Sequence, residues 1–447
     1  MYRLINWVFD HINKRSQILI QTPNHRSFGN GSEEIFYGLL KAKRENKKVL
    51  FLYPRLVLFG KYSLSVVSRE RFHLQSDYSV TNENIYGLLC GWLLSTYLLS
   101  LRVLDRLRHS RNLRRVLRLI QPKMAASAVK DHGYVVPRIS YSTLWKPHQV
   151  DSLSWKVVEE QNWRQQYEEY IPPRLTENRY SYAEQNRVKM GIPLTDWFVC
   201  LHVSENHPPI PRNASIHNYI EAIKVITAAG GWVVRLGDTT MMSLPRMKRV
   251  IDYPFTQYKS EVMDLYLIGQ CRFFIGCSSG PPMVATLFRK PRIIVNMTLW
   301  SIDFPIRMGD LVLIKHIFSR SRNRFLSIKE ILEEPYAVEV LSTVSDEYEI
   351  MENTSEEIQE IVEEFLIKPE PFEYSDLQKA FNKDRRKQVR RWLDQGEPRS
   401  WPGVPPDDIV TQQYRIGSLI DASAGTLGKR YLEQNWLMDD LKKPPAY

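Results

Sequence analysis

The chain has 447 residues, more than one ordinary hydrophobic core contains, so we expect at least two domains. With 43% hydrophobic and 25% charged residues, the composition is that of a folded globular protein and excludes disorder over a whole half of the chain. A formal net charge of +11 favours anionic partners, among them nucleotide phosphates, anionic lipid head groups and nucleic acid, without selecting one.

The N-terminal region alternates between strand and helix. Residues 17–22 (QILIQT) and 48–53 (KVLFLY) are apolar runs typical of buried strands, and residues 33–43 have the apolar spacing of a helix. Residues 23–32 are rich in turn formers and predict a loop before that helix. Strand, helix and strand in this order predict a parallel sheet.

Residues 85–101 contain no charge, and residues 102–120 that follow are rich in arginine with leucines at helical spacing. One interpretation is a buried core helix followed by a solvated basic helix. The other is a patch over residues 85–118 that lies on an anionic membrane surface. The polar content of the uncharged run argues against a complete membrane span.

The second half of the chain alternates more clearly. After a connection that ends in a short helix near residues 171–193, five strands and three helices are expected. The strands are residues 197–203, 232–236, 250–253, 272–276 and 292–296, and the helices are residues 216–229, 260–269 and 283–288. This order predicts a doubly wound α/β domain. In the tail, Thr354 and Glu357 form the pattern of a capping box before an amphipathic helix.

A short motif between the strand at 272–276 and the helix at 283–288 has the residues of a phosphate-binding turn. It reads GCSSGPP over residues 276–282. The serines supply hydroxyls, the glycine lets the backbone approach an anion, and a proline is tolerated where the helix begins. The alternative is a plain turn between strand and helix. The position at the carboxyl end of a sheet strand favours ligand binding.

These residues carry a resemblance to a known family. The runs CLHVSENHPPIPRNASIHNYIEAIKVITAAGGWVVRLGD, VIDYP and KSEVMDLYLIGQCRFFIGCSSGPPMVATLFRKPRIIVN resemble a bacterial family of GT-B-type glycosyltransferases associated with surface-polysaccharide and related glycan genes. The resemblance is specific over residues 185–300, weaker in the tail through GTLGKRYLEQNWLM, and weakest in the N-terminal half. Family members usually have Thr where this chain has Cys277, and Gly where it has Arg289.

The resemblance implies an α/β fold of the GT-B type, with two Rossmann-like doubly wound domains that face each other across a cleft. We expect an N-terminal acceptor domain over residues 1–175 with a hydrophobic and basic helical insertion, and a donor domain over residues 176–370. Residues 371–447 are expected to form a helical extension, for which packing back on the N-terminal domain is one arrangement.

The resemblance also implies a donor site in the second domain. The residues expected to hold the donor diphosphate are Ser278, Ser279, Gly280 and Pro281. Arg212 and Arg235 follow or end strands, where a guanidinium can pair with phosphate through two hydrogen bonds, and Lys259 is a weaker candidate. The alternative for each cation is a surface or interdomain salt bridge.

In GT-B enzymes the catalytic base usually comes from the N-terminal domain, near the loop that follows the first strand. The candidates here are His25 and Glu33 in TPNHRSFGNGSEE, and the alternative for His25 is a turn residue bonded to backbone. The run Gly29, Asn30 and Gly31 is expected to be a glycine-rich loop that lets acceptor or donor approach the backbone. Family members often have Gly-His where this chain has Gly29-Asn30.

We therefore expect a metal-independent glycosyltransferase without a cofactor, which uses a UDP- or GDP-linked sugar and a glycan or lipid-linked acceptor in the synthesis of surface polysaccharide or glycoconjugates. The chain has no Asp-x-Asp after a strand for a divalent metal. A catalytically inactive nucleotide- or sugar-binding protein and a basic nucleic-acid-binding protein are the rival hypotheses. No nucleic-acid module is visible, so nucleic acid is not an expected partner.

The expected location is the cytoplasm, with a peripheral position on the inner face of the membrane as a variant. Four scattered cysteines, none in a Cys-x-x-Cys pair, favour a reducing compartment and argue against a zinc site. The first residues contain too short an apolar run for a signal peptide.

Overall fold

The computed structural model describes residues 17–21, 23, 28–53, 56–59, 63–66, 70–80, 92, 95–96, 167–205, 211–298, 304–333, 347–369, 371–394 and 423–436. The chain forms two compact units, Met1–Leu153 and Ser154–Tyr447. The uncharged run at 85–101 and the arginine-rich residues after it lie outside the described residues, apart from 92, 95 and 96. Among the helices that the structure describes, none is both long and apolar enough to cross a membrane.

The first unit contains the expected strand–helix–strand motif. Strand β1 (Ile18–Gln21) and strand β2 (Lys48–Phe51) are parallel neighbours, and helix α2 (Phe28–Arg44) connects them. Strands β3 (Leu56–Phe59) and β4 (Ser63–Val66) form an antiparallel pair, followed by the 3-10 helix η1 (Glu70–His73). The parallel pairing of β1 with β2 confirms the prediction for this segment.

Helix α2 begins earlier than the sequence pattern indicated, and this corrects one prediction. Gly29, Asn30 and Gly31 lie in its first turn and do not form a glycine-rich loop. The Ser32 hydroxyl donates to the Phe28 carbonyl oxygen at 2.8 Å, a bond between successive helical turns. Both glycines are buried, so their missing side chains let this turn pack closely.

The second unit is built on a seven-stranded sheet in which all neighbouring strands are parallel. The strands are β5 (Phe198–His202), β6 (Trp232–Leu236), β7 (Val250–Asp252), β8 (Phe274–Gly276), β9 (Arg292–Met297), β10 (Leu311–Ile314) and β14 (Thr426–Leu427). Their spatial order is β14-β10-β9-β8-β5-β6-β7. Numbered along the chain, the first six strands have the order 3-2-1-4-5-6 of a Rossmann domain. The α/β class is confirmed.

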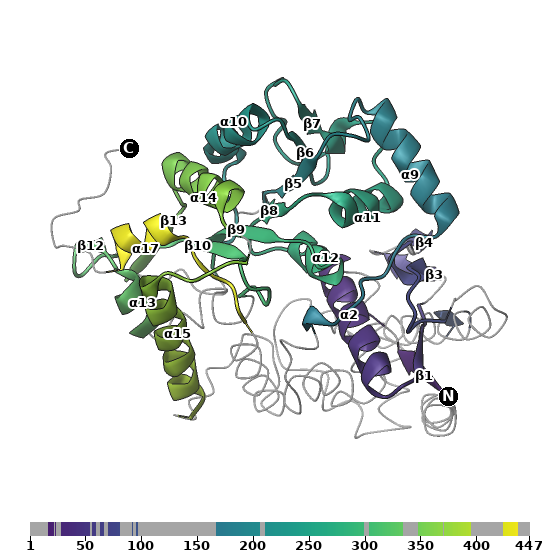
Figure 1. Ribbon diagram of the computed structural model, residues 1–447, viewed down its shortest axis with the longest axis horizontal. Coiled ribbons are helices and arrows are strands. Elements are labelled where there is room, and N and C mark those ends of the chain that lie inside the picture. Colours follow the sequence, from purple (N-terminus) through teal and green to yellow (C-terminus); the bar gives the residue numbers. More distant parts are fainter. Residues whose placement is uncertain are drawn as a thin grey trace, which may run out of the picture. The chain divides into compact units, whose positions relative to one another are not determined.

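Helices cover the sheet in two groups, which Figure 1 shows on opposite sides of it. Helix α10 (Ile220–Ala228), preceded by the 3-10 helix η2 (Ile216–Tyr219), packs against α14 (Ser355–Ile367). In the other group, α11 (Glu261–Gln270) contacts both α9 (Glu177–Lys189) and α12 (Pro281–Leu287). The capping box predicted for α14 is confirmed, because the Thr354 hydroxyl accepts from the Glu357 amide while the Glu357 carboxylate accepts from the Thr354 amide.

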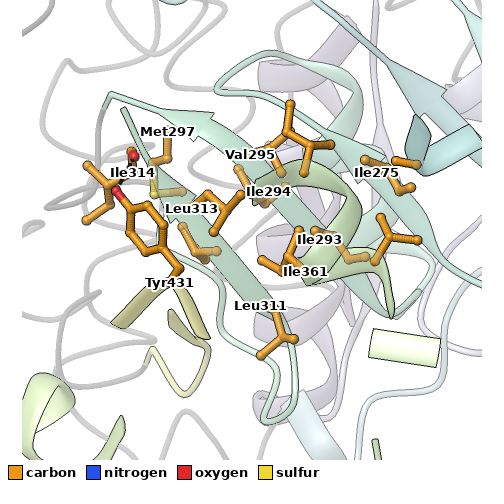
Figure 2. Packing of buried hydrophobic residues seen from close by; sticks show 14 of the residues in the cluster. Ile275, Ile293, Ile294, Val295, Met297, Leu311, Leu313, Ile314, Ile361 and Tyr431 are labelled. Carbon is orange, nitrogen blue, oxygen red and sulfur yellow. Dashed lines mark hydrogen bonds between the residues drawn. The ribbon is translucent and has the colours of Figure 1, made fainter. Parts of the chain in front are cut away.

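A hydrophobic core cluster of the second unit includes side chains of the sheet and of α14. Figure 2 shows Ile361 of α14 beside Ile293 of β9 and Leu311 of β10, all at most 2% exposed. Burial of such side chains contributes about 1.5–3 kcal/mol each relative to exposure.

The remaining elements extend the second unit towards its end. Strands β12 (Arg324–Phe325), β11 (His316–Ser319) and β13 (Tyr348–Met351) form a small antiparallel sheet. Helix α15 (Asp376–Asp394) contacts α13 (Ile328–Glu333), α17 (Lys429–Asn435) and β14, whereas the short η3 (Tyr253–Phe255) contacts β6 on the other side of the seven-stranded sheet. The Tyr431 hydroxyl of α17 donates to the Ile314 carbonyl oxygen at 2.6 Å. The described part of the tail therefore belongs to the second unit and supplies β14 at the sheet edge.

Candidate functional site

A cavity of about 510 Å³ opens at the carboxyl ends of β5, β6 and β8. It is lined by His202, Ser204, Glu205, Arg212, Asp238, Thr240, Met241, Ser279, Gly280 and Pro281. Strand β5 lies between β6 and β8, and the chain order reverses at β5, because the next strands go first to one side and then to the other. Ligands of open α/β sheets bind at such switch points.

His202 is the last residue of β5 and lines this cavity together with Ser279. Only 8% of its surface is exposed, and its Nδ1 lies 3.1 Å from the Ser279 hydroxyl oxygen. That hydroxyl also lies 3.2 Å from the Cys277 carbonyl oxygen, which can only accept. Both contacts are hydrogen bonds if His202 carries its proton on Nδ1 and donates to Ser279. The pair then fixes the Ser279 hydroxyl oxygen at the cavity wall.

Burial holds the pKa of His202 down to about 4, and the charge of the neighbouring Arg235 adds to this lowering. A buried imidazolium beside a guanidinium loses its hydration and is repelled. His202 is therefore neutral at physiological pH and brings hydrogen bonds, but no charge, to the cavity.

The pKa of His202 predicts a loss of stability in acid. The unfolded chain binds a proton at this histidine near pH 6.5, whereas the folded chain does so only near pH 4. The stability that depends on neutral His202 is thus complete above pH 6.5 and falls as the pH is lowered to about 4, by about 3 kcal/mol in total. Chemical unfolding of the wild type and of His202→Asn at pH 7 and pH 4.5 should show a steeper fall for the wild type. If the free energies of unfolding of the two proteins fell equally with pH, the low pKa of His202 would be contradicted. A midpoint near pH 6.5 in an NMR titration of the His202 ring would contradict it as well.

Arg212 is the cation that faces the cavity. It lies in a short segment held by backbone contacts: the Ala214 amide donates to the Ser204 carbonyl oxygen at 3.0 Å, and the Lys315 ammonium donates to the Asn213 carbonyl oxygen at 2.6 Å. Within the described residues Arg212 forms no ion pair, and its buried Nε has no hydrogen-bond partner. A half-buried guanidinium without a partner is an unfavourable arrangement that an anionic ligand would relieve.

Arg235 does not line the cavity. It is fully buried at the end of β6, with Nη1 3.1 Å from the Asp252 carboxylate and Nη2 3.7 Å from that of Glu205. Glu205 lines the cavity, whereas Arg235 does not. Direct pairing of Arg235 with a phosphate, as expected from the sequence, would require this ion pair to break.

The two partners of Arg235 hold one wall of the cavity in place. Glu205 accepts a hydrogen bond from the Met242 amide at 2.7 Å, and Asp252 accepts one from the Leu244 amide at 2.8 Å. Both amides belong to the segment that follows β6 and contributes Asp238 and its neighbours to the lining. Arg235 therefore supports the cavity indirectly, by keeping both carboxylates in position.

The turn after β8 lies at the end of that strand as predicted, but its serine hydroxyls and helix amides are not all available to a ligand. The Ser278 hydroxyl is buried and accepts from the Thr298 amide at 3.3 Å, so it is absent from the cavity lining. Pro281 and Pro282 occupy the first two positions of α12 and have no N–H groups, and the Met283 amide donates to the Gly280 carbonyl oxygen at 3.0 Å. Helix α12 thus presents few amides to an anion, and recognition falls to the side chains of Arg212 and Ser279.

Of the other predicted residues, only Lys259 lies in the described part of the second unit, and it does not line the cavity. Lys259 is exposed and pairs with Asp264 at 2.5 Å. Glu33 lies half-buried in α2 of the first unit, with Gly29, Asn30 and Gly31 in the turn before it, and His25 lies outside the described residues. In the part of the chain that the structure describes, no group of three His, Cys, Asp or Glu side chains has the arrangement of a metal site.

Several cavity residues were not selected from the sequence. They are His202, Ser204, Glu205, Asp238, Thr240 and Met241. All follow or end β5 and β6, two strands whose positions the apolar pattern predicts. The rule that ligands bind beyond the carboxyl ends of strands would have found them, had it been applied to every strand and not only to β8.

Comparison with known proteins finds distant structural similarities, among them the two that follow. No protein-family model matches this chain, and no curated protein sequence matches it. A glycosyl transferase family 9 protein from Veillonella parvula DSM 2008 is 10% identical, with a TM-score of 0.34 over 66% of this chain and 85% of that protein. The UDP-GlcNAc 2-epimerase of Methanocaldococcus jannaschii, solved with UDP-GlcNAc and UDP, is 12% identical, with a TM-score of 0.22 over 81% of this chain and 79% of the epimerase. At these scores the functional assignment rests on the cavity itself.

Proposed function

We propose that this chain is a glycosyltransferase whose donor, a sugar linked to a nucleoside diphosphate, binds in the cavity at the ends of β5, β6 and β8. One observation carries the proposal: the guanidinium of Arg212, which has no ion-pair partner among the described residues, lies with the Ser279 hydroxyl in a cavity at the switch point of a Rossmann-type sheet. Such sheets bind nucleotides at this place, and an arginine matches the geometry of phosphate oxygens.

Each lining group has a role in this proposal. Arg212 pairs with the donor diphosphate. The Ser279 hydroxyl keeps the hydrogen bond that it accepts from His202, and turns its single proton from the Cys277 carbonyl oxygen to a phosphate oxygen. Gly280 has no side chain, so a phosphate can approach the backbone between Ser279 and Pro281. Because His202 is neutral, the positive charge at this end comes from Arg212.

The reaction breaks the bond between the sugar's anomeric carbon and the diphosphate, and forms a bond from that carbon to an acceptor hydroxyl oxygen. The acceptor proton passes to a base, for which His25 and Glu33 remain our candidates. Arg212 stabilises the charge that develops on the leaving diphosphate, so the proposed mechanism needs no metal. The proposed acceptor is a glycan or a lipid-linked molecule, and the proposed role is the synthesis of surface polysaccharide or glycoconjugates. The proposed location is the cytoplasm, at the membrane periphery through residues 85–118.

Removal of the Arg212 guanidinium tests the donor site. We expect one or more of UDP, GDP, ADP and CDP to bind the wild type, and Arg212→Ala to weaken that binding about tenfold to a hundredfold, because a charge-assisted hydrogen-bond pair is lost. Isothermal titration and ligand-dependent melting measure the affinity. Arg272→Ala is the matched control. Arg272 is an exposed arginine that precedes β8, at the amino ends of the strands and so away from the cavity at their carboxyl ends.

The outcomes separate the rival functions. Slow release of nucleoside diphosphate from a bound nucleotide sugar without acceptor supports a transferase. Nucleotide binding without hydrolysis or transfer would identify a catalytically inactive binding protein. No binding of any nucleotide, together with salt-sensitive binding of DNA, would contradict the proposal in favour of the nucleic-acid hypothesis.

A further inference from the structure

The segment 212–215, which begins with Arg212, is fixed by two side chains from distant parts of the chain. Lys315, the residue after β10, donates from Nζ to the Asn213 carbonyl oxygen at 2.6 Å. Glu352, which lies between β13 and α14, accepts from the Ser215 amide at 2.8 Å. The backbone directly after Arg212 therefore cannot shift without breaking a hydrogen bond.

Lys315 is a rigid support for this segment. Only 5% of its surface is exposed, and its amide donates to the Met297 carbonyl oxygen at 3.0 Å, which continues the pairing of β10 with β9. The Ile314 carbonyl oxygen accepts from the Tyr431 hydroxyl at 2.6 Å and from Asn353 Nδ2 at 2.9 Å. Figure 2 shows Tyr431 beside Ile314. Since burial also removes most of the rotamer freedom of a lysine side chain, Nζ has a defined position.

The surroundings of Lys315 agree with support of the segment and not with direct contact to a ligand. Lys315 does not line the cavity. Burial lowers its pKa, and the negative charge of Glu352 opposes this lowering. With or without its extra proton, Nζ keeps an N–H that donates to the Asn213 carbonyl oxygen, so this contact does not depend on the charge. Attraction of a phosphate by the charge of Lys315 at a distance is the alternative.

We propose that Lys315 is a positioning residue for nucleotide binding: its hydrogen bond to the Asn213 carbonyl oxygen fixes the segment 212–215 and so holds the Arg212 guanidinium where it meets the donor diphosphate. This inference rests on the proposed function. A guanidinium binds phosphate through two hydrogen bonds only when both N–H groups are aligned with the oxygens. A fixed backbone reduces the freedom that Arg212 loses on binding, which strengthens binding without a new contact to the ligand.

A double-mutant cycle on nucleotide affinity tests this role. The ligand is whichever of UDP, GDP, ADP and CDP binds the wild type most tightly, and isothermal titration measures its affinity for all four proteins. Lys315→Met removes the donor and keeps a side chain of similar length. It should weaken binding about fivefold to tenfold in the otherwise wild-type chain. In the Arg212→Ala background the same substitution should change the affinity by less than about twofold, because no guanidinium is left to position.

Two controls separate positioning from a general effect on stability. Lys368→Met removes an ammonium that also donates to a backbone carbonyl oxygen, that of Gly309, at 2.8 Å. Gly309 precedes β10 at the amino end of the strand, away from the cavity, so this variant should keep the wild-type affinity. Melting temperatures without nucleotide show whether Lys315→Met is folded. If it is not, Lys315→Gln, whose amide ends one bond short of the Asn213 carbonyl oxygen, enters the same cycle with the same expected pattern.

The negative outcomes are distinct. Equal weakening by Lys315→Met in both backgrounds would show that Lys315 acts through its charge or through the structure as a whole, and would overturn the positioning role while the donor site stands. An unchanged affinity of Lys315→Met in the otherwise wild-type chain would also overturn the positioning role alone. A wild type that binds none of the four nucleotides would contradict the proposed function itself.

Discussion

Replacing Asp310 with alanine is expected to lower the free energy of unfolding of the second unit by about 3–5 kcal/mol. Asp310 is fully buried before β10, where it accepts from the Arg292 amide at 2.9 Å and from the Arg292 Nε at 3.2 Å. Arg292 is 2% exposed, so the alanine variant would leave its guanidinium charged, buried and without its carboxylate. Chemical unfolding followed by fluorescence and circular dichroism measures the loss.

A double substitution tests the reason for this loss. Asp310→Leu combined with Arg292→Met replaces the buried pair with apolar groups of similar volume, and should cost less than Asp310→Ala alone because the buried Arg292 charge is removed with its partner. Arg307, whose Nη1 lies 3.6 Å from the Asp310 carboxylate, is 28% exposed and loses this contact in both variants. The Arg292 Nη1 also donates to the Pro282 carbonyl oxygen and the Thr286 hydroxyl, at 3.2 and 2.6 Å, so the double variant additionally loses these two contacts with α12. A double variant less stable than the single one would show that packing at Asp310, and not charge pairing, dominates.

Arg235→Met is expected to be almost as destabilising, by about 3–4 kcal/mol, and to change the cavity as well. The substitution leaves Asp252 and Glu205 without their shared cation, and these carboxylates hold two amides of the segment after β6. The second effect is a higher pKa for His202, since the charge of Arg235 contributes to its low value. NMR titration of the His202 ring, combined with chemical unfolding, measures both.

The two effects distinguish Arg235 from a phosphate ligand. A side chain that only bound phosphate would weaken nucleotide binding on removal without a large loss of stability in the free protein. Arg235→Lys keeps the positive charge, so the pKa of His202 should stay close to its low wild-type value. The lysine cannot make the paired contacts of the guanidinium with both carboxylates, so stability should still fall. An unchanged free energy of unfolding in Arg235→Met would refute the supporting role.

The apolar pattern was sufficient to predict the frame of the second unit. Strands β5 to β9 fall within a few residues of their predicted positions, because each is a run of Val, Ile, Leu or Phe bounded by turn residues. Strand β14 was missed because its two residues are a strand only through their pairing with β10, which is far away in the sequence. The same limitation applies to β10, whose short apolar run (LVLI) was not recognised as part of the sheet.

The candidate site was predictable in position but not in detail. The GCSSGPP turn lies at the carboxyl end of a sheet strand, β8, as expected. The partner of a guanidinium, however, depends on residues that folding brings together. Arg235 pairs with Asp252 and Glu205, which are far from it along the chain, and no local pattern distinguishes this from a phosphate contact. The burial of Arg235 was easier to foresee, because strands of parallel sheets are covered on both faces.

The late position of β14 in the chain has a consequence for synthesis. Residues 426–427 pair with β10 at the sheet edge, so during translation that edge stays uncovered until these residues have emerged from the ribosome, more than a hundred residues after β10. An exposed strand edge is a template for pairing with other nascent chains. A premature stop anywhere between the last cavity residue and these two would leave that edge permanently open, so such shortened products should be prone to self-association even though every cavity residue is present.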